Sequence, residues 1–190
     1  MSYFEHFDIY FLYLINQTFS HEFADIFFPW ITDIHKSSLF LFIILPLFIF
    51  YIIFKSRIEG LLFVVFLTLT MAINDFIGGQ LIKPFFGRLR PSMQGLDVVL
   101  RVPQVDGYSF ISNHSANSFC LAFFCYLFYP KTGYILFPIA FFIALSRIYI
   151  GVHFPSDIIA GMLFGIVTSY CMSKVLIYVY DLKRKRVRNG

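Results

Sequence analysis

The strongest constraint on this chain is a series of long apolar stretches, with very few charges, between Ser38 and Tyr180. An apolar helix of about 20 residues is long enough to cross the hydrocarbon core of a membrane. Hydrophobic residues make up 58% of the 190 residues and charged residues only 14%, whereas a soluble domain has about 45–50% and 25%. A chain of this size has too little interior to bury so much apolar surface. We therefore predict an integral membrane protein.

About five of these stretches are predicted to be membrane spans. They are helical, because a backbone surrounded by lipid must satisfy its own hydrogen bonds. The predicted fold class is an all-α polytopic membrane bundle of about five transmembrane helices, with residues 1–190 as one integral membrane domain and residues 36–180 as its transmembrane core. The predicted spans are Ser38–Phe54, Ile58–Gly78, Ser115–Tyr129, Gly133–Ile150 and Phe154–Tyr180.

Residues 1–35 fit neither a span nor a soluble domain. Phe4, Phe7 and Phe11 recur at helical spacing with Glu5 and Asp8 between them, and residues 22–33 repeat the pattern. Such segments are typical of amphipathic helices at a membrane surface, so we predict two N-terminal interfacial helices on the outer side. A first true span in this region is the alternative. The first 15 residues have no basic region, so a cleaved signal peptide is not expected.

Basic residues predict the direction of the spans, because cytoplasmic loops carry an excess of Lys and Arg. The spans alternate without conflict when Lys55, Arg57, Lys131 and a basic cytoplasmic tail at residues 181–190 are all placed inside. The tail then acts as a topology signal, and no nucleic-acid partner is expected. This arrangement predicts a multi-pass protein of the bacterial inner (cytoplasmic) membrane. Its outer, periplasmic face then carries six basic residues, Lys36, Lys83, Arg88, Arg90, Arg101 and Arg147.

Two outer loops contain the residues that can carry chemistry. In the first loop, Lys83 and Arg90 precede Pro91, and Arg147 opens the second. Converging Lys and Arg side chains form an anion site, since Arg matches phosphate oxygens in pairs and Lys supplies a point charge. Ser112 and Asn113 are good N-caps for the span that follows. The free backbone N–H groups of a helix N-terminus favour an anion as well.

The second loop also contains a histidine and a carboxylate with the spacing of neighbours on a helix. His153 and Asp157 are four residues apart, and Pro155 suits the first turn of a helix. Asp157 can therefore accept from one imidazole nitrogen and leave the other free to attack, as in catalytic triads. His114, from another helix, can supply a proton to a departing oxygen. We predict metal-free nucleophilic catalysis, with no metal site and no cofactor.

Together, these residues resemble the three-part signature of the type 2 phosphatidic acid phosphatase superfamily. The signature here runs from Lys83, through Arg90-Pro91 and Ser112-Asn113-His114, to Ser146-Arg147 and finally His153 and Asp157. It departs from the usual Pro-Ser-Gly-His of the family, reading Ile-Ser-Asn-His instead. The resemblance covers the region Lys83–Asp157, and the flanking spans fit the small bacterial members of the family.

The resemblance implies a role for each matching residue. Lys83, Arg90 and Arg147 would hold the phosphate with help from Ser112 and backbone N–H groups, including that of Asn113. His153 would form a phosphohistidine, Asp157 would fix its tautomer, and His114 would protonate the leaving oxygen. Asp75 is expected to partner an active-site cation, and Arg88 either contacts phosphate or lies at the interface. Tyr108–Phe110 would help line the headgroup site, whereas His6, His21 and His35 are assigned no role.

The predicted function is therefore an integral membrane lipid phosphatase that acts at the periplasmic face through a phosphohistidine. Its partners would be the bilayer and a membrane lipid phosphate, with lipid A 1-phosphate preferred. Undecaprenyl pyrophosphate and phosphatidylglycerol phosphate are the alternative substrates. A lipid phosphotransferase is the competing reaction, and a non-catalytic membrane interaction protein is the competing class. Cys120, Cys125 and Cys171 lie in apolar runs and are interpreted as buried hydrophobic residues.

Overall fold

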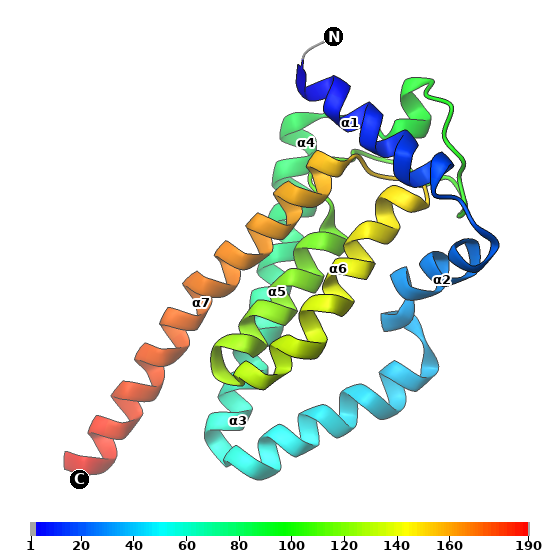
Figure 1. Cartoon of the computed structure of the whole chain (residues 1–190). Coiled ribbons are helices and arrows are strands. Elements are labelled where there is room, and N and C mark those ends of the chain that lie inside the picture. The colour runs from blue at the N-terminus through cyan, green and yellow to red at the C-terminus, as the bar shows by residue number, and fades with distance from the viewer. Residues whose placement is uncertain (1–2, 190) are drawn as a thin grey trace.

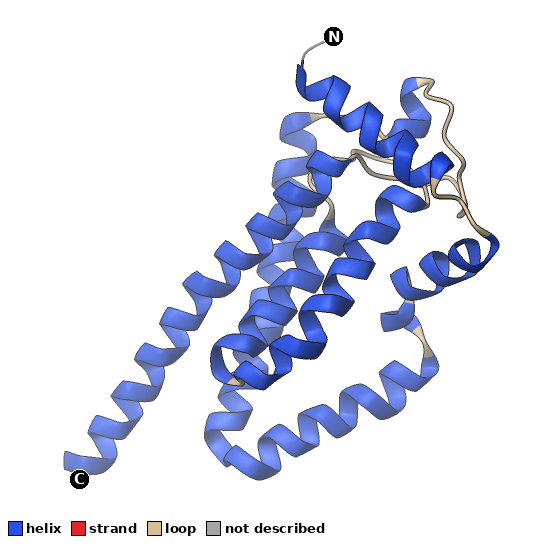
Figure 2. Cartoon of the chain, in the orientation of Figure 1, coloured by secondary structure: helices blue, strands red, loops and turns tan. Residues whose placement is uncertain are grey.

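The chain folds into a bundle of helices in a computed structural model that describes residues 3–189, without the side chains of Phe4 and residues 186–189 (Figure 1). Over these residues the backbone consists of helices, turns and loops (Figure 2). The predicted all-α class is confirmed.

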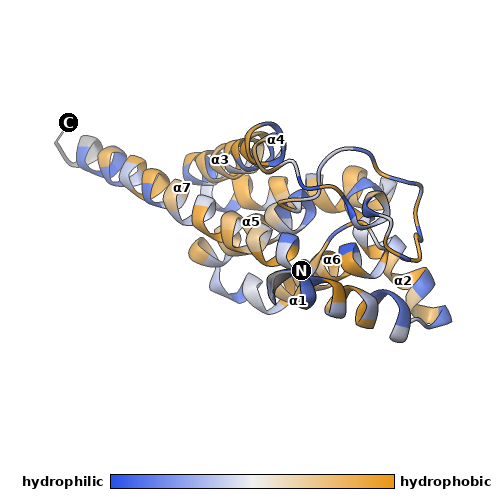
Figure 3. Cartoon of the chain, turned by 90° about the horizontal axis from the view of Figure 1, so that it is seen from above, coloured by the Kyte–Doolittle hydropathy of each residue, from blue (hydrophilic) through white to orange (hydrophobic). Residues whose placement is uncertain are grey.

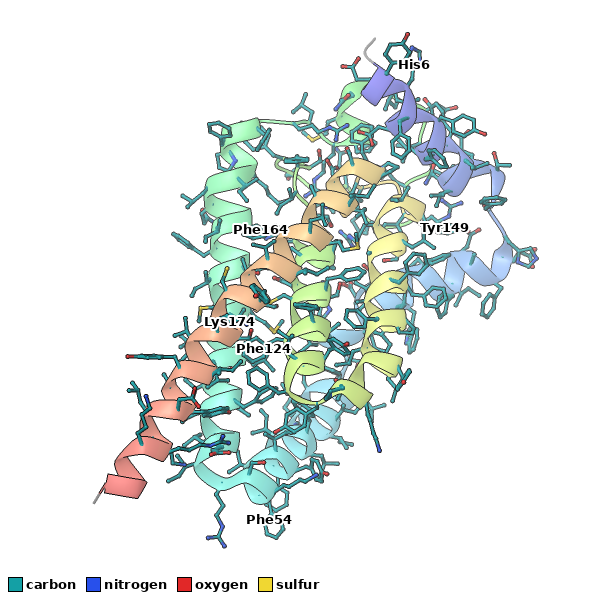
Figure 4. The ribbon with its side chains drawn as sticks, turned by 60° about the vertical axis from the view of Figure 1, so that its left-hand side comes forward. His6, Phe54, Phe124, Tyr149, Phe164 and Lys174 are labelled. Atoms are coloured by element: carbon teal, nitrogen blue, oxygen red, sulfur yellow. The ribbon has the colours of Figure 1, made fainter. Side chains whose placement is uncertain are left out.

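Four helices make up the bundle: α3 (Leu45–Phe76), α5 (Asn113–Phe128), α6 (Gly133–Tyr149) and α7 (Pro155–Asn189). α5 packs against each of the other three. Phe63, Phe124 and Leu176 are completely or almost completely buried where α3, α5 and α7 meet, and Phe124 lies midway along the bundle (Figure 4). In lipid such contacts hold helices together through close packing, because lipid tails are as apolar as the side chains.

Two glycines on α7 allow that helix to approach α5 closely. A methyl group added at Gly161 would lie 2.6 Å from the carbonyl oxygen of Ser112, and one added at Gly165 would lie 2.1 Å from that of Ala116. Small residues four apart are a known device for bringing two membrane helices together. The contact aligns the first turns of α5 and α7, which carry the two halves of the predicted site.

Three helical stretches in the described residues are long and apolar enough to cross a membrane, namely Phe40–Gln94, Pro130–Tyr149 and Pro155–Lys185. The first is bent at Arg57, whose φ of 49° and ψ of −120° are not helical. The predicted spans Ser38–Phe54 and Ile58–Gly78 are the two arms of this stretch. The predicted span Ser115–Tyr129 corresponds to α5, which has only 16 residues. The count of five spans is therefore not confirmed, although the membrane bundle is.

The arm before the bend leaves the bundle. It contains η3 (Phe40–Ile44) and the first part of α3, and it swings away from α5 and α6 (Figure 1). Most of its large apolar side chains are exposed, including Phe42, Leu47, Phe50 and Phe54. Figure 3 shows hydrophobic residues along most helices of the bundle and hydrophilic residues near the C-terminal end of α7. Exposed apolar surface of this extent suits contact with lipid.

The N-terminal region forms helices, as predicted: α1 (Tyr3–Tyr13), the π-helical turn η1 (Leu14–Thr18), α2 (Glu22–Thr32) and the short η2 (Ile34–Lys36). α1 crosses the end of the bundle where α7 begins (Figure 1). Phe7 and Phe11 on α1 are exposed, whereas Asp8 is completely buried. The acid thus faces the bundle and not the solvent.

The residues predicted to lie on the cytoplasmic side are all at the end of the molecule opposite α1. The bend in α3, the turn η6 (Pro130–Thr132) and the C-terminal end of α7 all lie far from α1 (Figure 1), and Phe54 and His6 lie at opposite ends in Figure 4. The predicted basic tail is not a separate segment, because α7 continues through it to Asn189. The side chains of Arg186 and Arg188 in that tail lie outside the described residues.

Candidate active site

The candidate site lies at the α1 end of the bundle, where the N-termini of α5 and α7 meet. The backbone N–H of Ser112 donates to the carbonyl oxygen of Asp157 at 3.1 Å. One turn further on, the hydroxyl of Ser115 donates to the carbonyl oxygen of Ile158 at 2.8 Å. These bonds, together with the glycine contacts, connect the segment carrying His114 to the segment carrying His153.

His153 and Asp157 form the central pair of the site. Nδ1 of His153 lies 3.3 Å from Oδ2 of Asp157, and both side chains are buried. If Nδ1 carries the proton, it donates to the carboxylate and Nε2 keeps its lone pair. Burial, followed by the charges of Lys83 and Arg90, lowers the pKa of His153 well below its ordinary value. The imidazole is therefore neutral near pH 7, which is the form that can attack.

The carboxylate of Asp157 is held on both sides. Its Oδ2 also accepts from the backbone N–H of Phe154 at 2.9 Å, and its Oδ1 accepts from Arg88 at 2.8 Å. The guanidinium of Arg88 lies over the ring of Phe154, 4.0 Å from its centre. Arg88 therefore pairs with the carboxylate beside His153, and its described contacts do not place it in lipid.

Arg90 and Lys83 lie on the other side of His153. NH1 of Arg90 donates to the carbonyl oxygen of Val152 at 3.0 Å and lies 3.3 Å from Nε2 of His153. Nζ of Lys83, in α4 (Lys83–Phe86) after the π-helical η4 (Ile77–Ile82), donates to the carbonyl oxygen of Tyr108 at 2.9 Å. The free nitrogen of the imidazole thus faces a cationic surface.

Arg147, the third predicted phosphate ligand, lies in the last turn of α6 and is buried. Its NH1 donates to the hydroxyl of Thr32 on α2 at 2.8 Å, and its buried Nε has no partner in the part of the chain that the structure describes. Its carbonyl oxygen accepts from the backbone N–H groups of Val152 and His153. The tight turn that follows therefore fixes His153 relative to Arg147.

The segment Ser112–His114 begins α5, as predicted. The buried hydroxyl of Ser112 caps the helix by accepting from the N–H of Ser115 at 3.4 Å. Nε2 of His114 is buried and has no hydrogen-bond partner among the described residues. An unpartnered buried nitrogen is costly unless a ligand completes it. This atom is therefore available to a bound group.

Asp75 is held by amide side chains, and its charge acts on Lys83. Its Oδ1 accepts from the side-chain amides of Asn113 at 2.9 Å and Asn117 at 3.1 Å, so its described hydrogen-bond partners are amides and not an active-site cation. Asn113 stands where the family usually has glycine, and it lies against a glycine of η4, since a methyl group added at Gly78 would come 3.1 Å from its Oδ1. Gly78 thus leaves room for the side chain of Asn113.

The predicted headgroup-lining segment Tyr108–Phe110 lies beside these cations. Tyr108 is partly exposed and provides the carbonyl group that holds Lys83, whereas the ring of Phe110 packs against Phe86 with 4.5 Å between centres. Ser109 is buried and its N–H donates to the carbonyl oxygen of Arg88 at 2.7 Å. The segment therefore supports the loop that carries the cations.

Sequence reasoning missed three contributors from the N-terminal region. Asp8 accepts from Arg88 and from both the backbone N–H and the hydroxyl of Ser156. Thr32 accepts from Arg147, and the ring of His35 lies 5.8 Å from that of His114, centre to centre. The amphipathic pattern showed that these segments are helical but contained no signal for contacts more than 75 residues away in the chain.

Two of the six outer basic residues pair with carboxylates of the N-terminal region. Lys36 pairs with Asp33 at 2.8 Å, and Arg101 pairs with Asp25 while its guanidinium lies over the ring of Tyr149. The remaining four, Lys83, Arg88, Arg90 and Arg147, surround the two histidines. This arrangement can bind a tetrahedral anion, attack its central atom from His153 and protonate a departing group from His114.

Comparisons with known proteins identify relatives of this chain. The model of the PAP2 superfamily matches residues 59–181. The chain is 35% identical over 138 residues to the lipid A 4'-phosphatase of Porphyromonas gingivalis, an alignment that covers 69% of this chain and 58% of that protein. The chain thus spans little more than half the length of this curated relative.

Two solved structures are similar over most of the chain. The crystal structure of Aquifex aeolicus LpxE superimposes with a TM-score of 0.65 at 30% sequence identity, covering 88% of this chain and 94% of that one. A PAP2 type phosphatidylglycerolphosphate phosphatase from Bacillus subtilis superimposes with a TM-score of 0.67 at 22% identity, covering 92% and 87%. The second likeness shows the fold alone.

Proposed function

The chain belongs to the PAP2 superfamily, and from this premise we propose that it is a phosphatase of membrane lipids that works through a phosphohistidine. The observation that carries the proposal is the position of His153. One ring nitrogen lies against Asp157 and the other lies 3.3 Å from a guanidinium nitrogen of Arg90. A phosphate held by Arg90 would therefore present its phosphorus to the attacking nitrogen.

In the first step, Nε2 of His153 forms a bond to phosphorus and the bond from phosphorus to the lipid oxygen breaks. Lys83, Arg90 and Arg147 bind the three remaining oxygens, whose charge grows in the transition state. Asp157 stabilises the imidazolium character that develops on His153. Burial lowers the pKa of His114, and the negative charge of the bound phosphate opposes this effect, so that His114 is protonated and gives its proton to the departing lipid oxygen. Its unpartnered Nε2 supports this role.

In the second step, water attacks the phosphohistidine and inorganic phosphate leaves. His114, now neutral, accepts the proton of that water, as microscopic reversibility requires. We propose that no resident metal takes part, because the three cations already supply the charge that a metal would otherwise provide. A lipid hydroxyl in place of water would make the enzyme a phosphotransferase, and the product distinguishes the two reactions.

The proposed substrate is a phosphate monoester of lipid A. Support comes from the Porphyromonas gingivalis relative, whose name specifies the 4'-phosphate. The sequence favoured the 1-phosphate as the group removed. The name of this relative supports removal of the 4'-phosphate at least as strongly. Undecaprenyl pyrophosphate and phosphatidylglycerol phosphate remain the competing substrates.

We propose that the site faces the periplasm from the inner membrane. The bend of α3, the turn η6 and the end of α7, which carry Lys55, Arg57, Lys131 and the basic residues from Lys183 on, lie at the end of the bundle away from the site. The positive-inside tendency then favours this end as cytoplasmic. α1 and α2 would lie at the outer interface.

The test is phosphate release by the purified full-length chain in detergent. Lipid A, undecaprenyl pyrophosphate and phosphatidylglycerol phosphate are compared by kcat/KM, with His153→Asn as the blank. We expect the highest value for lipid A, and phosphorus NMR of the product shows whether the 1- or the 4'-phosphate was removed. A higher value for the diphosphate would overturn the substrate, and phosphorylated lipid in place of free phosphate would overturn hydrolysis.

A further inference from the structure

The short helix η2 brings a second histidine to the mouth of the site. His35, for which the sequence indicated no role, has its ring 5.8 Å from that of His114, with the two planes at 72°. Asp33, directly before η2, faces the same point. One ligand atom from each of Asp33, His35 and His114 lies within 4.8 Å of the other two. These three residues are here called the Asp33 cluster.

We propose that the Asp33 cluster binds Zn²⁺ and that the bound ion inhibits the enzyme. Two imidazoles and one carboxylate are typical zinc ligands, and three protein ligands leave a fourth position open. Imidazole nitrogens select zinc and its neighbours among the transition metals over Mg²⁺ and Ca²⁺, which prefer oxygen ligands.

The geometry needs only a small adjustment to hold the ion. Zinc lies about 2.0–2.2 Å from nitrogen and oxygen ligands, so tetrahedral ligands are separated by roughly 3.4 Å. The ligand atoms, which lie within 4.8 Å of one another, must therefore approach by up to about 1.4 Å. Asp33 and His35 are exposed, which leaves their side chains room to adjust. The less exposed His114 already has an unpartnered Nε2, and this second observation indicates a ligand.

The positive charges of Lys36 and Arg147 oppose the binding of Zn²⁺, and Lys36 provides a way to test the site. Lys36 pairs with Asp33 at 2.8 Å, but both side chains are about half exposed or more, so the pair is weak and exchangeable. The charge of Arg147 acts on His114 and disfavours a second cation there. Zn²⁺ therefore competes with Lys36 for the carboxylate, and removal of that ammonium group should strengthen binding.

Inhibition follows because His114 belongs both to the Asp33 cluster and to the proposed catalytic site. A metal ion bound to His114 occupies the lone pair on which its proton exchange depends, so the imidazole can no longer donate a proton to the leaving oxygen. This consequence rests on the proposed function, whereas metal binding itself does not. The cluster would couple lipid dephosphorylation to the zinc concentration outside the cytoplasmic membrane.

The first measurement is binding alone. Purified full-length protein is titrated with Co²⁺, whose visible absorption reports tetrahedral nitrogen and oxygen ligation, and with Zn²⁺ by equilibrium dialysis. We expect His35→Ala to weaken binding about tenfold or more, the range expected when a metal site is damaged. Lys36→Gln should tighten binding. His6→Ala removes an exposed histidine at the far end of α1 and should change nothing (Figure 4).

The second measurement is inhibition of phosphate release, with each variant compared with its own zinc-free rate. The half-inhibiting Zn²⁺ concentration should rise about tenfold or more in His35→Ala and fall in Lys36→Gln. Equal binding by wild type and His35→Ala, or no binding to either, overturns the site. Binding that depends on His35 in a chain with no phosphatase activity would leave the site standing and overturn the proposed function instead.

Discussion

Nδ1 of His153 lies 3.3 Å from Oδ2 of Asp157, and the other oxygen of the same carboxylate is occupied by Arg88. The carboxylate therefore has one orientation, and the imidazole that it faces has one preferred tautomer. The pair is assembled within five consecutive residues, with His153 just before α7 and Asp157 in its first turn. The nucleophile is thus fixed locally, and the phosphate site is built around it by other elements.

His153→Ala should abolish turnover, because no other described residue faces the phosphate site from that position. We expect a loss of at least about 10⁴-fold, and Asp157→Asn should cost a comparable factor by removing the group that orients the ring. Phosphate release and trapping of the phosphoenzyme measure both effects. His21→Ala, outside the site, is the control, and normal turnover in His153→Ala would overturn the covalent mechanism.

His114→Ala should separate substrates by their leaving groups. A lipid alkoxide needs a proton to leave, whereas p-nitrophenolate does not. The variant should therefore slow phosphoenzyme formation from the lipid about 10²–10⁴-fold, the usual value of general acid catalysis, and largely spare p-nitrophenyl phosphate. Single-turnover phosphorylation with each substrate tests this. Equal slowing of both would make His114 a phosphate ligand and not a proton donor.

Asp8→Asn should destabilise the protein and lower its kcat, although Asp8 is far from His153 in the sequence. The buried carboxylate holds Arg88 and the N-terminus of α7 through Ser156, so its neutralisation leaves buried donors poorly matched. We expect a loss of about 1–3 kcal/mol in the free energy of unfolding and up to about 10² in kcat. Asp181→Asn, an exposed carboxylate on α7, is the matched control. Thermal unfolding in detergent and kcat provide the readout, and unchanged values would remove Asp8 from the site.

Chelation should not reduce activity. If Lys83, Arg90 and Arg147 supply the positive charge, the enzyme should retain its full rate in EDTA, and the rate should rise where contaminating zinc is removed. Vanadate, which mimics pentacoordinate phosphorus, should inhibit. Loss of activity in EDTA that one divalent metal restores would contradict the proposed mechanism.

Thiol labelling in intact cells should reveal the orientation. Cysteine at Met93, in the exposed turn η5 (Pro91–Gln94), should react with an impermeant reagent once the three native cysteines are replaced. Met93 is preferable to Gly95, whose φ of +72° strains any other residue. Cysteine at Lys131, in η6 at the other end, should react only after lysis. The reverse pattern would place the site in the cytoplasm.

The sequence predicted those parts of the site whose residues belong to short patterns along the chain. His153 with Asp157, the helix start at Ser112 and the cations at Lys83, Arg90 and Arg147 could be identified because each belongs to a local pattern with a direct chemical meaning. The membrane class followed in the same way from the apolar stretches. The structure brings these residues together, while their catalytic roles remain proposals for the experiments above.

The parts that were not predicted depend on distant contacts. The roles of Gly161 and Gly165 depend on their contact with α5. The acid of an amphipathic helix normally faces water, so the pattern did not indicate that Asp8 is buried against the bundle. The bond from Asp8 to Ser156 joins residues 148 positions apart. A single sequence contains no signal for such a pair. The same holds for His35, which became notable only beside His114.

The long separation in sequence between Asp8 and Ser156 also determines when the site can be completed during synthesis. A chain grows from its N-terminus, so the carboxylate on α1 is made first and its partner on α7 only near the end. Until α7 has entered the membrane, the growing protein carries the cations of the first outer loop without the attacking imidazole. An interrupted chain would therefore lack the proposed nucleophile, and the site is complete only when the two ends of the polypeptide have met.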